Sequence, residues 1–153
     1  DGIVLDFPSL PAKKVKAAAA LQKALGAKLK AVVKVGDDLL VELASDAAVR
    51  KLRPDFAALA KIKVRGVIVT AKAARKYDFI SRFFGPAVGV DEDPVTGSAH
   101  CALAPYWGEK LGRTTMRGYQ ASQRGGEVAV ELAGDRVLLR GSAVTFSRGQ
   151  LVV

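Results

Sequence analysis

The stretch 91–98, DEDPVTGS, combines three carboxylates with a run of small residues that opens a predicted helix. Pro94 stops that helix from extending back over the carboxylates, and Thr96 is expected to cap it with its hydroxyl. The first-turn amides of Gly97 and Ser98 would then have no backbone partner. Free amides at the positive end of a helix suit a carboxylate or a phosphate. The stretch therefore predicts a seat for an anionic ligand.

Asp93 is the principal candidate for acid–base chemistry, because it lies beside this predicted seat. A general acid or base must reach the moving proton and have a pKa near the working pH, which burial near another negative charge favours. Spacing alone leaves an alternative, in which Asp93 is only a turn residue before Pro94. We interpret Asp91 and Glu92 as cap and turn carboxylates.

His100 is the only histidine of the chain, which makes it a candidate base. It falls one turn into the predicted helix, so we group it with Gly97 and Ser98 as substrate-binding and expect it to act from behind them through a hydrogen bond. Cys101 is the only cysteine, which excludes an internal disulfide and gives no zinc-ligand spacing. We predict that Cys101 is a small core residue and that the protein binds no metal and no cofactor. We also expect it in the reducing cytoplasm.

Composition favours one domain with a real core, because half of the 153 residues are apolar and no low-complexity run interrupts them. No apolar run reaches membrane-spanning length, so we expect no membrane partner.

The formal charge of +9 would attract anions. Seven lysines between Asp6 and Asp37 have no aromatics among them, which favours a solvated surface over nucleic-acid binding. Because the chain begins without Met, we expect an upstream portion outside the numbered sequence.

Hydrophobic periodicity and turn residues predict many short strands and few helices. Helices are expected over 15–25, 46–52, 55–62 and 98–111. Strands are expected over 3–7, 29–35, 39–44, 64–70, 77–84, 114–120, 127–133, 136–139 and 142–146.

The helix over 98–111 is apolar around almost its whole circumference, despite Pro105, which should bend it. A helix of this kind must be enclosed by the rest of the fold. An α+β fold, in which a curved and mainly antiparallel sheet wraps around one central helix, satisfies this requirement.

The motifs EDPVTGSAH, CALAPYW and QASQRGG resemble the C-terminal half of the phenazine-biosynthesis isomerase (PhzF-like) family. The resemblance extends from IVLDFP near the start to GSAVTFSRGQL near the end. It therefore covers the whole chain but only one of the family's two lobes. It implies that residues 1–153 form a single C-terminal lobe with the diaminopimelate-epimerase-like β-roll fold.

The resemblance also implies a function. The chain would supply half of the active site of a cofactor-independent isomerase or epimerase that moves a proton on a small carboxylated metabolite. Asp93 matches the family's active-site aspartate, whereas no part of the sequence matches the N-terminal lobe that carries the essential glutamate. General acid–base catalysis contributes about 100-fold to 10,000-fold, so we expect the chain alone to be nearly inactive. Whether the isolated chain is an enzyme is therefore open.

Two points stay open at this level. The partner across the cleft could be the N-terminal lobe or a second copy of the chain. The alternative function is that of a non-catalytic module that associates with itself as a homodimer and keeps only the anion seat. In QASQRGG, Arg124 could pair with a substrate anion or with the missing lobe, while Gly125 and Gly126 could simply let the chain turn.

Overall fold

The computed structural model describes residues 2–16 and 19–152 of the chain. Their strands form one sheet in the order β1-β10-β9-β8-β6-β5-β4-β3-β2, with β7 paired to β6. Neighbouring strands are antiparallel except for the pairs β4–β5 and β6–β8, which are parallel. The strands are β1 Ile3–Pro8, β2 Lys13–Lys14, β3 Ala31–Val35, β4 Asp38–Glu42, β5 Val67–Lys72, β6 Phe79–Gly85, β7 Val90–Asp93, β8 Thr115–Gln120, β9 Gly126–Ala133 and β10 Arg136–Gly141.

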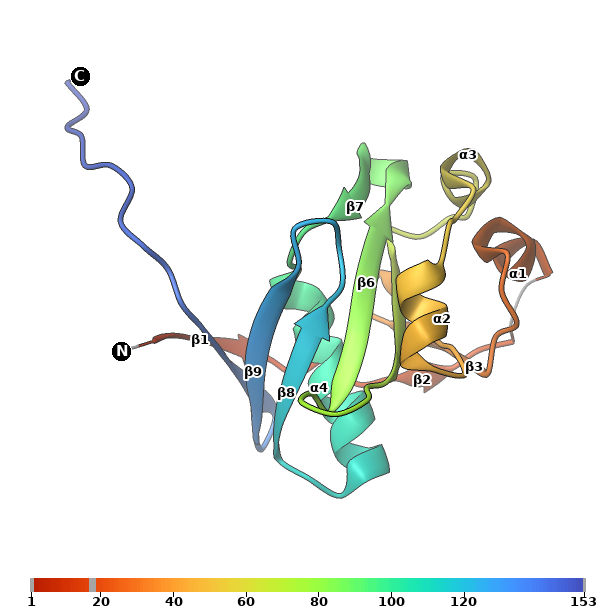
Figure 1. Ribbon diagram of the computed structural model, residues 1–153, viewed down its shortest axis with the longest axis horizontal. Helices are drawn as coiled ribbons and strands as arrows, with labels where there is room; N and C mark the ends of the chain where they lie inside the picture. Colours follow the sequence, from red (N-terminus) through yellow and green to blue (C-terminus); the bar gives the residue numbers. More distant parts are fainter. Residues whose placement is uncertain (1, 17–18, 153) are drawn as a thin grey trace.

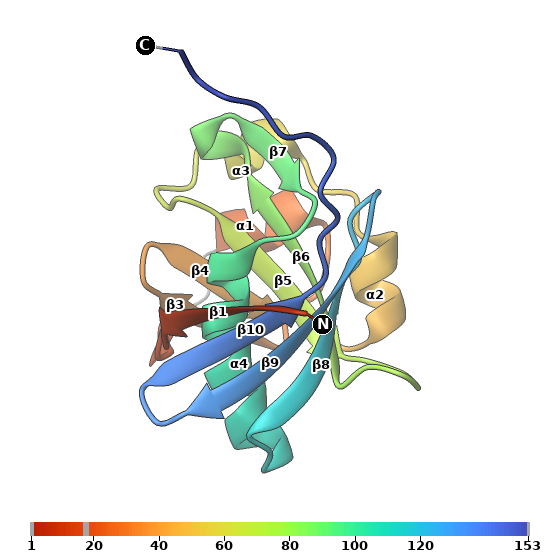
Figure 2. The same ribbon diagram turned by 90° about the vertical axis from the view of Figure 1, so that its left-hand side faces the viewer.

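The sheet curls around α4, which spans Gly97–Leu111 and lies inside the curve (Figures 1 and 2). Its side chains Ala99, Leu103 and Trp107 are almost completely buried, and they form one core with apolar residues from strands on both sides of the curl. Because strands surround the helix, nearly its whole circumference can be apolar. This confirms the predicted α+β fold with an enclosed central helix.

A second core lies on the outer face of the sheet. There the short helices α1 Ala19–Leu25, α2 Asp46–Lys51 and α3 Phe56–Leu59 cover the strands β3 to β6 (Figure 1). Leu21, Val49 and Leu59 are buried between these helices and the sheet. The strands β5 and β6 therefore contact apolar groups on both faces, which explains their nearly continuous apolar sequences.

The far end of α4 is fixed by a buried carboxylate on β4. Glu42 accepts hydrogen bonds from the Tyr106 hydroxyl at 2.5 Å and from Lys30 at 2.6 Å, and it also pairs with Lys110. Burial by itself raises the pKa of Glu42, but the bonds from Lys110, Lys30 and Tyr106 outweigh it, so this pKa lies below its ordinary value. These bonds fix the helix relative to β4.

Several local predictions are wrong. The helix expected over 15–25 begins at Ala19, and Val15 and Lys16 precede it without helical structure; residues 17–18 lie outside the described residues. The strand expected over 142–146 is absent, because this extended tail finds no neighbouring strand within the described structure. Val144 and Phe146 are accordingly exposed. The hairpin of β3 and β4 is confirmed.

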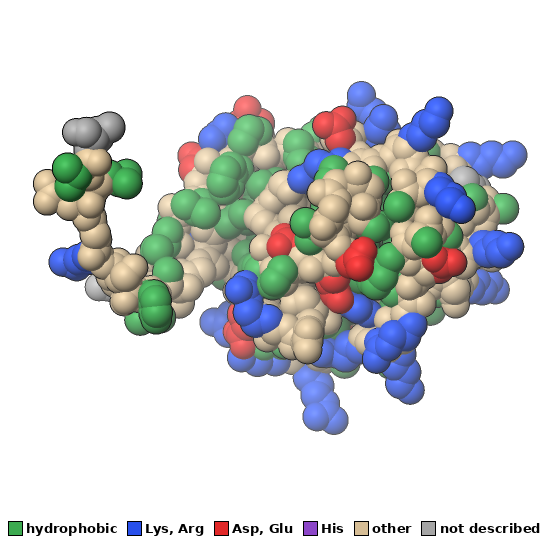
Figure 3. Space-filling view, turned by 90° about the horizontal axis from the view of Figure 1, so that it is seen from above, with side chains coloured by type: hydrophobic (Ala, Val, Ile, Leu, Met, Phe, Trp, Pro, Cys, Tyr) green, Lys and Arg blue, Asp and Glu red, His purple; other side chains and the backbone are tan. Residues whose placement is uncertain are grey.

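One end of the sheet is apolar and uncovered. Within the described residues the edge strand β1 pairs only with β10, and its Ile3 and Leu5 side chains are about half exposed. The tail after Gly141 leaves the body at this end (Figure 1). Seen from above, basic side chains project around the rest of the body (Figure 3), and all seven lysines between Asp6 and Asp37 are exposed. Among the described residues, no helix is long and apolar enough to cross a membrane.

Candidate functional site

The three consecutive carboxylates lie on or at the end of β7, not in turns as predicted. β7 pairs with β6, with Phe83 opposite Asp93. Glu92 accepts two hydrogen bonds from the buried Arg82, at 2.7 and 2.8 Å, and Arg82 also donates to the Leu52 carbonyl at 2.7 Å, just after α2. Glu92 is therefore a structural ion-pair partner, and Asp91 is exposed. Asp93 ends the strand and begins the loop to α4.

The sequence predicts that the Thr96 hydroxyl caps the helix, but in the structure it does not. Thr96 is at the N-cap position, but its Oγ1 donates to Oδ2 of Asp93 at 2.5 Å. The Gln120 side-chain amide donates to that same Oγ1 at 3.1 Å and so directs the hydroxyl hydrogen towards Asp93. The half-buried Asp93 carboxylate is thus oriented through one oxygen, while Oδ1 has no hydrogen-bond partner among the described residues.

Gln120 fixes the main chain of the same loop. Its Oε1 accepts from the Thr96 amide at 2.9 Å, and its Nε2 donates to the Asp93 carbonyl at 2.7 Å. The Gln120 side chain has no exposed surface. The glutamine therefore acts as a clamp that holds both ends of the segment from Asp93 to Thr96.

The rest of QASQRGG holds the middle of this segment. Ser122 donates to the Pro94 carbonyl at 2.7 Å, and the Gly125 amide donates to Ser122 at 3.0 Å. A Cβ on Gly126 would lie 2.3 Å from a methyl carbon of Val95, so only glycine lets the two segments approach this closely. The motif, whose role could not be derived from the sequence, positions the Asp93 loop.

The start of α4 presents the amides that the sequence predicted. The amides of Gly97 and Ser98 have no hydrogen-bond acceptor within the described residues, and Gly97 is exposed. The Ser98 hydroxyl is half-buried and accepts a hydrogen bond from Arg65 at 3.0 Å. Thr96, which is hydrogen-bonded to Asp93, directly precedes Gly97 and Ser98, and we call these four residues the corner.

His100 lies behind this corner in the core. Its side chain is fully buried, and Nδ1 lies 2.8 Å from the Thr96 carbonyl, to which the neutral ring donates. Burial lowers the pKa of His100 to about 4, so the ring is uncharged at neutral pH. Cys101 is also buried, and burial raises the pKa of its thiol. Across the described ranges, no group of His, Cys, Asp and Glu side chains is arranged to hold a metal ion.

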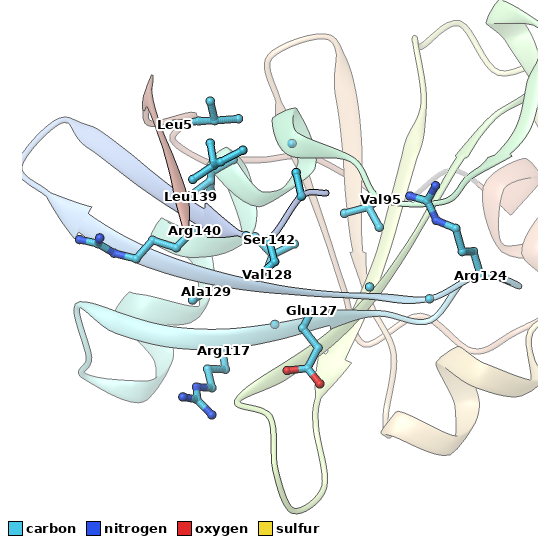
Figure 4. Close-up of a pocket in the computed structure, with 17 residues that line it drawn as sticks. Leu5, Val95, Arg117, Arg124, Glu127, Val128, Ala129, Leu139, Arg140 and Ser142 are labelled. Carbon is cyan, nitrogen blue, oxygen red and sulfur yellow. The ribbon is translucent and has the colours of Figure 1, made fainter. Parts of the chain in front are cut away.

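An open cleft of about 860 Å³ borders the corner. Gly97 and Val95 form part of its wall, whereas Asp93, Ser98 and His100 do not line it. Leu5 and Leu139 make an apolar side, Arg124 extends alongside Val95 at one end, and Arg117 and Glu127 point to the opposite side of the sheet (Figure 4). The cleft could therefore take a ligand that has an apolar body and a negative group.

Together, these features define an α+β fold in which a mainly antiparallel sheet curls around one apolar helix. The family model of phenazine biosynthesis-like proteins (PhzC-PhzF) matches residues 3–149. The chain belongs to this family.

The relatives agree with this assignment. A protein of Pseudomonas aeruginosa named as an uncharacterized isomerase is 51% identical over 149 residues, which are 97% of this chain and 57% of that protein. A PhzF-family crystal structure from Enterococcus faecalis superposes with a TM-score of 0.90 at 40% identity, over 98% of this chain and 57% of that one. A predicted epimerase of P. aeruginosa, at 20% identity and a TM-score of 0.65, shares the fold. The chain spans little more than half the length of these relatives.

Sequence reasoning missed two residues that contact the corner. Gln120 stood within a motif that was singled out, but its contacts depend on how β8 lies beside the Asp93 loop. Arg65 gave no local signal, because it pairs with Asp38 and Ser98, 27 and 33 positions away.

Proposed function

We propose that the chain is the C-terminal lobe of a cofactor-independent isomerase or epimerase that moves a proton on a small carboxylated metabolite. One observation carries the proposal. Asp93 is held through one carboxylate oxygen by Thr96, its other oxygen has no partner among the described residues, and Thr96 directly precedes the unpaired amides of Gly97 and Ser98. A family of isomerase relatives supports the same reaction class.

In this proposal the ligand's carboxylate accepts hydrogen bonds from the Gly97 and Ser98 amides and from the Ser98 hydroxyl, at the positive end of a 15-residue helix. Oδ1 of Asp93 exchanges a proton with, or accepts a hydrogen bond from, the reacting part of the ligand. His100 supports the site from behind by holding the Thr96 carbonyl. In this proposal the second acid–base group is a glutamate on an N-terminal lobe, as the resemblance to the PhzF-like family implies.

The partner across the cleft should cover the apolar end of the sheet. Ile3 and Leu5 of β1 are half exposed and line the cleft with Leu139. An apolar face of this kind is a typical contact surface. We propose that an N-terminal lobe, or a second copy of this chain in a homodimer, packs there and closes the site. The proposal also includes a cytoplasmic setting, which the free Cys101 supports.

The test compares two aspartates of the same strand. In a protein that carries this chain together with a glutamate-bearing lobe, Asp93→Asn should lower kcat by about 100-fold to 10,000-fold. Asp91→Asn is the matched control, because Asp91 is exposed, and it should leave turnover within about twofold. Dihydro-hydroxyanthranilate is the first substrate to try, because the resemblance to the PhzF-like family, whose phenazine-pathway members isomerise it, implies the same class of reaction. Equal turnover by both variants would refute the assignment of Asp93.

A further inference from the structure

Arg65 lies between α3 and β5 and is held against the hairpin of β3 and β4. Its amide donates to the Asp37 carbonyl at 3.0 Å, and the next residue, Gly66, accepts from the Leu39 amide at 3.0 Å. These two bonds fix the main chain on both sides of the Arg65 side chain. The hairpin therefore positions the main chain from which the guanidinium extends.

Two groups hold the guanidinium itself. Asp38, whose side chain is only 3% exposed, accepts from Nε of Arg65 at 2.9 Å and also from Nη2. The guanidinium also lies over the Phe83 ring, 5.4 Å from its centre. A Cβ on Gly66 would lie 2.3 Å from this ring, so glycine there leaves room for the stack. The hydrogen bond to Asp38 raises the pKa of Arg65 above its ordinary value, which keeps the guanidinium charged.

This fixed guanidinium reaches the start of α4. Nη2 of Arg65 donates to Oγ of Ser98 at 3.0 Å. A hydroxyl that accepts from a cation must direct its own hydrogen elsewhere, because arginine offers no acceptor. The Ser98 hydroxyl hydrogen is therefore available as a donor to a third group, and Arg65 polarises it.

We propose that Arg65, anchored by Asp38, is a positioning residue that aims the Ser98 hydroxyl at the carboxylate of the ligand. This inference rests on the proposed function, since it assumes that the ligand's anionic group lies at Gly97 and Ser98. It adds that the seat depends on a hydrogen-bond relay from Asp38 through Arg65 to Ser98. Because Asp38 offsets the charge of Arg65, the pair contributes direction rather than net charge.

The experiment measures benzoate binding to the 153-residue chain by amide NMR at constant ionic strength. Replacing Arg65 alone would leave the buried Asp38 unpaired and could unfold the protein, so the test variant is R65Q/D38N, which removes both charges together. The control is R50Q/D46N, which makes the same chemical change in the ion pair within α2. The amide spectrum and the unfolding midpoint report whether each variant is folded.

We expect benzoate dissociation constants about tenfold higher for R65Q/D38N and for Ser98→Ala, and unchanged for R50Q/D46N. Adding R65Q/D38N to Ser98→Ala should change the constant by less than about twofold, because Arg65 acts through that hydroxyl. A merely structural role would not produce this dependence on Ser98.

Two results would overturn different statements. If Ser98→Ala weakens binding but R65Q/D38N does not, or if the two effects multiply, the role of Arg65 is refuted while the anion seat stands. If benzoate shifts neither the Gly97 nor the Ser98 amide in the unmodified chain, the seat itself fails, and with it the proposed function.

Discussion

Replacing Gln120 with leucine should destabilise the chain by loosening the Asp93 loop. The change removes three hydrogen bonds, among them those to the Thr96 amide and the Asp93 carbonyl, in a region where the Gln120 side chain has no exposed surface. Each buried polar group left unsatisfied costs about 1–3 kcal/mol. After the gain from burying an apolar side chain, we expect the free energy of unfolding to fall by about 2–5 kcal/mol.

Urea unfolding followed by circular dichroism measures this loss, and hydrogen exchange of the Thr96 amide reports the loop directly. Gln123→Leu is the matched control, because Gln123 belongs to the same motif but is exposed, and it should change stability by less than about 0.5 kcal/mol. The reasoning is refuted if both variants unfold alike and the Thr96 amide of Gln120→Leu exchanges as slowly as before.

Two further predictions concern His100 and Gly125. The pKa of His100 is about 4 in the folded state and about 6.5 in the unfolded chain. Between these pH values the unfolded state binds the extra proton. The free energy of unfolding therefore falls as the pH is lowered through this window, by about 3 kcal/mol in total. The His100→Asn variant can still donate to the Thr96 carbonyl, and its free energy of unfolding, measured by urea titration, should fall less over the same pH range. Parallel plots of this free energy against pH for the two proteins would contradict the prediction. Gly125→Ala should unfold at clearly lower urea than Gly134→Ala. Both glycines have positive φ, but only at Gly125 would a Cβ meet another group, the Tyr119 hydroxyl at 2.2 Å. Equal midpoints would show that Tyr119 moves aside freely.

The central helix and the strands around it could be predicted because their signals are local. A run such as Ala99 to Trp107, apolar on every side, can only be stable when enclosed, whatever encloses it. The glycine-containing turn between β3 and β4 likewise predicts its own hairpin. These features depend on spacing within one segment, which the sequence displays directly.

The details of the corner could not be predicted, because they depend on contacts between distant segments. Asp91 and Glu92 have the local pattern of turn residues. Nothing in that pattern indicates that Glu92 forms an ion pair with Arg82, ten positions earlier. From its position alone, the Thr96 hydroxyl was expected to cap the helix. It bonds to Asp93 and Gln120 instead. The residues 142–146 alternate like a strand, but a strand also needs a neighbour, which an alternating pattern does not supply.

The most direct test of the account is where a carboxylate binds on the unmodified chain. Benzoate should produce its largest amide shifts at Gly97 and Ser98, and benzyl alcohol, which lacks the charge, should not. Asp93→Asn should leave these shifts in place, because in the proposed mechanism Asp93 exchanges the proton and does not bind the carboxylate. Shifts confined to the exposed lysines between Asp6 and Asp37, with Gly97 and Ser98 unmoved, would contradict the account.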